Sequence, residues 1–218
     1  MSMRSNRIRR AFRLLAGASV GILTVSSLIA GVYPQSAVAG VGTSLMQTAP
    51  VVAPGKYEVK AQADIILNRG GGFNLSPHFV TGLVDHLFDV DVYFGTGTTD
   101  FQMGALTKYN LLPDLDGQLG MSFNAGFSFI RDEDINSVLL TGGILISKEK
   151  KMEFGSLSPY SSLQVEGLIN SVNSQLPVTW IFGSKWVFQD SPWNFYSEVG
   201  LNLNQSFWSI CLGASYPF

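Results

Sequence analysis

The feature that most constrains this chain is an alternation of apolar and polar residues that runs from residue 56 to the last residue. In the closing segment, for example, Ile210 and Leu212 alternate with Cys211 and Gly213. Successive side chains of a strand point to opposite faces, so this period of two predicts a strand with one apolar face. The pattern recurs in about ten segments separated by turn-forming residues, which predicts an all-β chain with one antiparallel sheet.

The apolar faces could meet either a protein core or lipid. A soluble sandwich or lipocalin-like barrel would place its polar face in water, where charged side chains are expected. Here only 14% of residues are charged, against about 25% in ordinary soluble domains. The polar faces are rich in Gly and Ser, and large aromatic residues gather near the segment ends. These features favour a closed transmembrane barrel with an apolar exterior and a polar lumen.

The end of the chain points to a class of protein. Ile210, Leu212, Ala214 and Tyr216 lie at alternate positions before the terminal Phe218. Tyr216 and Phe218 in this setting resemble the signal that the barrel assembly machinery recognises in small bacterial outer-membrane β-barrels of eight to ten strands. The resemblance implies an integral protein of the outer membrane that contacts the lipid bilayer and lipopolysaccharide. It identifies no particular functional family.

Ten strands is the favoured count. The number falls to eight if the evenly apolar stretch at 137–147 or the hairpin near Asp85 is not part of the wall. Either even number places both ends of the barrel on the same side of the membrane, which we expect to be the periplasm.

The first residues predict export. Five arginines without an acidic residue precede an uncharged, mostly apolar run at 14–32, and Ala37-Val38-Ala39 follows. This order predicts a signal peptide at 1–39 that is cleaved before Gly40. The alternative is an uncleaved membrane helix, since the uncharged run is nearly long enough to span a bilayer. Residues 40–55 contain several breakers and predict a periplasmic tether, followed by the barrel at 56–218.

Composition excludes several functions. Loss of the five arginines leaves nine basic against sixteen acidic residues, a negative balance that disfavours nucleic acid as a partner. The single cysteine excludes an intrachain disulfide and a cysteine-based zinc cluster. No metal-ligand cluster, phosphate loop or cofactor motif is visible, so we expect no cofactor. The sequence assigns no solute and no oligomeric state.

Charged residues on the predicted lumen face are the main functional candidates. Two interpretations stay open: mixed charges that pair and plug the lumen, and a narrow, weakly cation-preferring pore. The expected acidic constriction of such a pore is Asp89 with Asp91. The candidate pore-lining residues are Asp89, Asp91, Lys108, Glu166, Lys185 and Glu198.

An enzyme is the alternative hypothesis, although we expect the chain not to be one. Ser76 and His78 share the polar face of one predicted strand. A hairpin with Asn68 opposite Phe73 would bring Asp64 beside both. Ser, His and Asp within reach of one another can form an activated nucleophile, and similar residues serve outer-membrane lipid hydrolases. A lone S-x-H motif is common by chance, however, and no further motif of such enzymes surrounds it.

Overall fold

The computed structural model describes residues 44–218, apart from 68–70, 85, 133–134 and 171–173. The predicted signal peptide and its cleavage site before Gly40 therefore lie outside the described residues. Each predicted segment forms a strand, and two short strands are added. The strands are β1 (Tyr57–Ile66), β2 (Gly72–Val84), β3 (Phe88–Gly97), β4 (Phe101–Leu112), β5 (Gly120–Asp132), β6 (Ile135–Ser147), β7 (Lys150–Met152), β8 (Gly155–Asn170), β9 (Ser174–Gln175), β10 (Val178–Phe188), β11 (Asn194–Asn204) and β12 (Ser209–Pro217).

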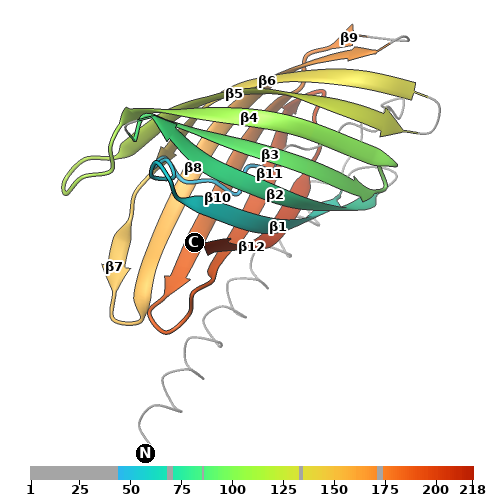
Figure 1. Ribbon diagram of the computed structural model, residues 1–218. Helices are drawn as coiled ribbons and strands as arrows, with labels where there is room; N and C mark the ends of the chain where they lie inside the picture. Colours follow the sequence, from blue (N-terminus) through green and yellow to red (C-terminus); the bar gives the residue numbers. More distant parts are fainter. Residues whose placement is uncertain (1–43, 68–70, 85, 133–134, 171–173) are drawn as a thin grey trace, which may run out of the picture. The chain divides into compact units, whose positions relative to one another are not determined.

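Ten of these strands form a closed ring (Figure 1). Each pairs antiparallel with its neighbours in the order β1-β2-β3-β4-β5-β6-β8-β10-β11-β12, and β12 pairs with β1. At this seam the backbone nitrogen of Tyr57 donates to the carbonyl oxygen of Phe218 at 3.0 Å, and the nitrogen of Phe218 donates back at 2.9 Å. The short strands β7 and β9 pair only with β8, one at each of its ends. The predicted ten-stranded antiparallel barrel is confirmed.

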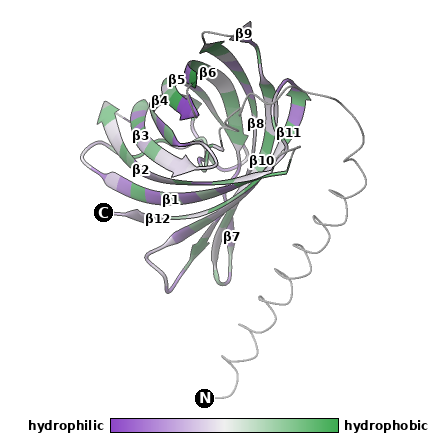
Figure 2. Ribbon diagram, turned by 90° about the vertical axis from the view of Figure 1, so that its right-hand side faces the viewer, coloured by the Kyte–Doolittle hydropathy of each residue, from purple (hydrophilic) through white to green (hydrophobic). Residues whose placement is uncertain are grey.

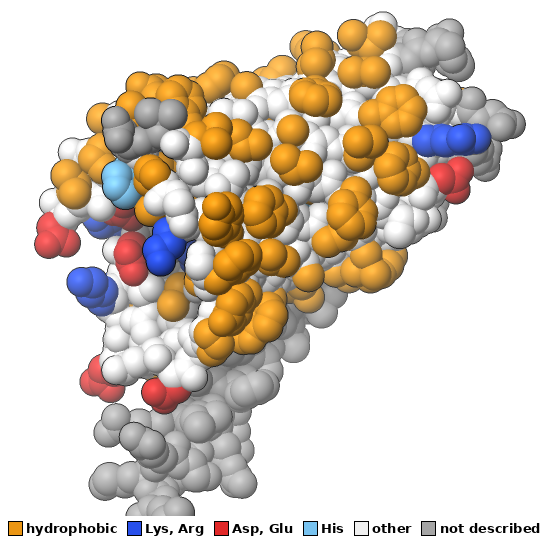
Figure 3. All heavy atoms as spheres, viewed as in Figure 1, with side chains coloured by type: hydrophobic (Ala, Val, Ile, Leu, Met, Phe, Trp, Pro, Cys, Tyr) orange, Lys and Arg blue, Asp and Glu red, His pale blue; other side chains and the backbone are white. Residues whose placement is uncertain are grey.

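The two faces of the wall are inverted relative to a soluble protein. Along β1, for example, Lys60 and Gln62 are buried while Val59 and Ala61 are exposed. Large apolar side chains cover the exterior (Figure 3), and Phe94 on β3 and Phe127 on β5 are 60% and 58% exposed. Figure 2 shows the same alternation of hydropathy along the ribbons. An exposed apolar surface of this extent requires lipid rather than water around it.

Aromatic rings form a belt at one end of the barrel, here called the terminal rim because Tyr57 and Phe218 lie there. Tyr57 stacks on both Phe79 and Phe218, each with ring centroids 5.7 Å apart. The rings of Trp193, just before β11, and Tyr216 on β12 have centroids 5.2 Å apart. Rings with one apolar and one polar end are favoured where lipid meets water, so the belt marks a membrane interface.

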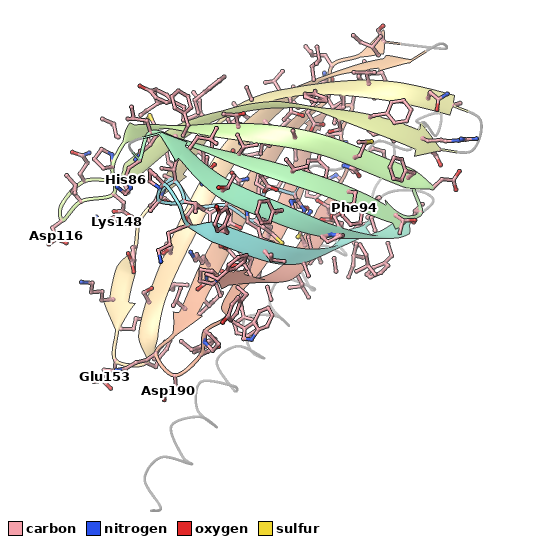
Figure 4. All side chains as sticks on the ribbon, viewed as in Figure 1. His86, Phe94, Asp116, Lys148, Glu153 and Asp190 are labelled. Atoms are coloured by element: carbon pink, nitrogen blue, oxygen red, sulfur yellow. The ribbon has the colours of Figure 1, made fainter. Side chains whose placement is uncertain are left out.

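Charged residues occupy the turns beyond this belt. Figure 4 shows Asp116, Glu153 and Asp190 in three different turns, all at the terminal rim. The opposite end, called the distal rim, carries the turns at 98–100 and 205–208. Among the described residues, no helix is long and apolar enough to cross a membrane.

Candidate functional site

The lumen contains a piece of the chain itself. Residues 44–53, here called the lumen segment, lie inside the ring, where Met46 and Ala49 are fully buried. The sequence predicted these residues as a tether outside the barrel. The structure differs because the stretch 40–55 has no charged residue, while its backbone groups find partners on the charged inner wall. Buried backbone groups need such partners, so these contacts hold the segment inside.

Glu198 on β11 binds the start of the lumen segment. Its Oε2 accepts a hydrogen bond from the backbone nitrogen of Leu45 at 2.9 Å, and its Oε1 accepts one from Met46. The hydroxyl of Tyr160 on β8 donates to the same Oε1 at 2.6 Å. One carboxylate thus joins two strands of the wall to two successive amides of the segment.

Two lysines hold the carbonyl groups of the segment. Lys108 Nζ on β4 donates to the carbonyl oxygens of Thr48 at 3.0 Å and Pro50 at 2.9 Å. Lys60 Nζ on β1 donates to the carbonyl oxygen of Met46 at 3.3 Å. The wall therefore supplies anionic acceptors for the segment's N–H groups and cationic donors for its carbonyls, and such charge-assisted hydrogen bonds are the stronger kind.

Two carboxylates of β3 also contact the segment. Asp89 accepts from the backbone nitrogen of Val52 at 3.0 Å and pairs with Lys108 Nζ at 3.1 Å. Asp91 pairs with Lys60 Nζ at 3.2 Å and accepts from Gln47 Nε2 of the segment at 3.1 Å. Both side chains are 1% exposed. The two residues predicted as an acidic constriction are thus engaged with lysines and with the segment.

Glycine at two wall positions lets the segment approach closely. A Cβ at Gly82 on β2 would overlap the carbonyl oxygen of Val52, and one at Gly213 on β12 would overlap the side chain of Met46. Pro54 also forms a parallel bridge with Gly82, just before the chain enters β1. The wall is thus shaped around the segment at two places, the backbone of Val52 and the side chain of Met46.

The remaining predicted pore-lining residues also face the lumen. Glu166 on β8 is 1% exposed, and Lys185 on β10 is half-buried with its Nζ 5.8 Å from the ring centre of Tyr196. Tyr196 in turn donates from its hydroxyl to Glu58 at 3.2 Å. Strand parity in the sequence was sufficient to predict these orientations.

Ser76, His78 and Asp64 line one cavity, as predicted, but among the described residues no hydrogen bond joins any two of them. Ile65, not Asn68, lies opposite Phe73, so Asp64 faces Asn74 rather than Pro77. The predicted register is wrong because the first turn takes up more of the chain than the NRGGG motif suggested. Asp64 instead accepts hydrogen bonds from Ser44 and from Gln62 Nε2.

His78 contacts Asp91 rather than the predicted Asp64. Its Nδ1 lies 2.9 Å from Asp91 Oδ1, and its ring stacks on Tyr93 with centroids 5.0 Å apart. Ser76 is on the same lumen face and, like His78, is less than a tenth exposed. Bilayer lipids contact the other face of the wall, so this placement does not favour a lipid hydrolase.

A small cavity of about 30 Å³ remains between the lumen segment and the wall. A cavity of this size admits a water or a single ion. Its polar lining includes Gln47, Gln62, Ser76, His78, Asp91 and Tyr93.

The sequence matches no known protein family and no curated protein. Among solved structures, the crystal structure of the β domain of the Bordetella autotransporter BrkA is similar, with a TM-score of 0.45 and 12% sequence identity. That match covers 75% of this chain and 98% of the BrkA domain. The ring of ten paired strands, with its polar interior and apolar exterior, is the fold of an outer-membrane β-barrel.

Proposed function

We propose that this protein is an integral outer-membrane barrel that rests in a sealed state and forms a narrow pore when the lumen segment leaves. The observation that supports the proposal is the position of residues 44–53, which contact the wall on β1, β3, β4 and β11. Small barrels fill their interior with side chains. Here a separate stretch of chain contributes to the filling.

The nature of the contacts supports a removable seal. Residues 44–53 make no strand pairing, because the Pro54–Gly82 bridge lies just after them at the terminal rim. Side chains of the wall hold the segment by hydrogen bonds. Water can replace each of these partners, whereas exposure of a strand edge to lipid is far more costly. A vacated lumen would be lined by more carboxylates than lysines, which favours cations over anions.

A reversible lock tests the proposal. Ser44 Oγ donates a hydrogen bond to Asp64 on β1, and Asp64 lies opposite Cys211 on β12, the only cysteine of the chain. Ser44→Cys should therefore form a reducible crosslink that fixes the segment to β12. We expect wild-type protein in planar bilayers to be mostly silent, and a variant with residues 45–52 replaced by a Gly/Ser stretch of equal length to show frequent discrete openings.

The crosslink gives the discriminating comparison. Rare wild-type openings should vanish in oxidised Ser44→Cys protein and return on reduction, while Ser44→Ala should respond to neither treatment. Silence of the Gly/Ser variant, with heat-modifiable gel migration showing a folded barrel, would overturn the pore proposal in favour of a purely structural barrel.

We also propose that the terminal rim faces the periplasm. Tyr57 and Phe218 lie together there, as expected for a barrel assembled from the periplasm with the help of the assembly machinery. The distal rim would then face lipopolysaccharide. Labelling of the two rims from outside the cell tests this orientation.

A further inference from the structure

We propose that the cavity beside the lumen segment binds a small metal cation, with His78 Nε2 and the Oε1 atoms of Gln47 and Gln62 as its protein ligands. These three residues line the same cavity, and each is at least nine-tenths buried. The three atoms have no hydrogen-bond partner among the described protein atoms. Buried polar atoms are almost always satisfied, so a shared ligand accounts for all three.

The two amide groups present oxygen, not nitrogen, to the ligand. Gln47 Nε2 donates to Asp91 Oδ2 at 3.1 Å, and Gln62 Nε2 donates to Asp64 Oδ2 at 2.8 Å. A carboxylate accepts hydrogen bonds, so each neighbouring carboxylate fixes the amide with its nitrogen toward the acid. The oxygen of each amide is then left as an acceptor, which an electron-poor ligand can use.

His78 has the arrangement expected of a metal-binding imidazole. Its Nδ1 lies 2.9 Å from Asp91 Oδ1, and its ring is stacked on Tyr93. Histidines that bind metals commonly donate the other ring N–H to a carboxylate, which fixes the tautomer and orients the free nitrogen. Asp91 is therefore a positioning residue here, because it leaves Nε2 with a lone pair.

The lining of the cavity gives an independent reason for a cation. It includes the carboxyl groups of Asp64 and Asp91 and no lysine or arginine. Among the described residues, Lys60 pairs with Asp91, whereas Asp64 accepts from the neutral side chains of Ser44 and Gln62. A buried carboxylate without an opposite charge is costly, and a bound cation reduces that cost.

The proposed site differs from a conventional structural metal site. Among the described residues, no group of three His, Cys, Asp or Glu side chains could hold a metal. One imidazole nitrogen and two amide oxygens leave coordination positions for water. A borderline ion such as Zn²⁺ accepts this mixture of nitrogen and oxygen, whereas Mg²⁺ prefers oxygen alone.

The site joins the wall to the lumen segment, because Gln47 belongs to the segment and His78 to β2. A cation bound there stabilises whichever state contains all three ligands. We therefore expect it to favour the sealed state, and this consequence alone rests on the proposed function. Binding itself is measured without conductance, so failure of the pore proposal leaves the binding test intact.

The test is a calorimetric titration in which Zn²⁺ alone is added to the tag-free, folded barrel in detergent micelles. We expect one saturable site per chain in wild-type protein, and binding at least about tenfold weaker in His78→Gln. The chain has only two histidines, and the other, His86, lies in the exposed turn between β2 and β3 (Figure 4). His86→Gln is thus the matched control and should bind as wild type does.

Gln47→Leu is a second variant that removes a ligand without altering the wall, and it too should weaken binding. Heat-modifiable migration checks that each variant is folded. Absence of saturable binding in wild type would mean that the cavity holds water only and would overturn the proposal. The proposal also fails if folded His78→Gln binds as tightly as wild type, or if His86→Gln abolishes binding.

Discussion

At the scale of single residues, one carboxylate contributes most to the position of the lumen segment. Glu198 accepts from Leu45, Met46 and Tyr160 at once. Glu198→Ala would leave these donors buried without an acceptor, at about 1–3 kcal/mol for each unsatisfied group. We expect a clear fall in the urea midpoint of barrel unfolding in vesicles. Glu149→Ala removes an exposed carboxylate and should leave the midpoint unchanged; equal midpoints for both variants would contradict this role of Glu198.

The inward orientation of Glu198 and Asp91 was predictable from residue parity, but their partners were not. Odd or even position in a strand fixes the face on which a side chain lies. It does not show which residues meet that side chain across the lumen. The lumen segment has no periodic pattern, so its position depends on tertiary contacts alone. One signal was present in the sequence: the stretch 40–55 has no charge and few flexible polar residues, unlike the Gly/Ser-rich or charged composition of extended tethers.

At the scale of elements, the seam between β1 and β12 closes the ring, and Phe218 at its end is expected to act both in stacking and in assembly. Tyr57 stacks on Phe218 and on Phe79 with the same centroid distance of 5.7 Å and the same interplanar angle of 28°. Phe218→Ala and Phe79→Ala should therefore cost similar stability, about 0.5–1.5 kcal/mol each beyond lost burial. This comparison can be made by urea titration of barrels refolded in vitro.

Assembly in cells should separate the two variants. If Phe218 is part of the signal read by the assembly machinery, only Phe218→Ala should lower the amount of heat-modifiable protein in the outer membrane. Equal amounts of folded Phe218→Ala and Phe79→Ala protein in the outer membrane would contradict an assembly role of Phe218. Tyr216 is its expected companion in that signal.

Elements were more predictable than their registers. All ten wall strands, including the weakly patterned β6, correspond to predicted segments, because alternation is a property of each strand by itself. The register of β1 against β2 depends on where the intervening turn begins and ends, which the residue types of the turn do not determine. The carboxylate predicted to contact His78 was therefore Asp64, whereas Asp91 makes that contact and Asp64 lies elsewhere on the lining of the same cavity.

At the scale of the whole molecule, orientation in the membrane is the property to test. With Cys211→Ser as the background, Asp116→Cys places a thiol on the terminal rim and Asp100→Cys places one on the distal rim. An impermeant maleimide added to intact cells should label only the Asp100→Cys protein, and lysed cells should show both labelled. Labelling of Asp116→Cys alone in intact cells would reverse the proposed orientation.

The position of the lumen segment also constrains the order of events during folding. The seam pairs Glu58 with Pro217, so the ring cannot close until the last residues of the chain have been made. The segment leads directly into β1, and the proposed open state requires that it can enter or leave the lumen of a closed ring. Closure therefore depends on the slowest kind of contact, between residues far apart in sequence, and the filling of the lumen is a separate step.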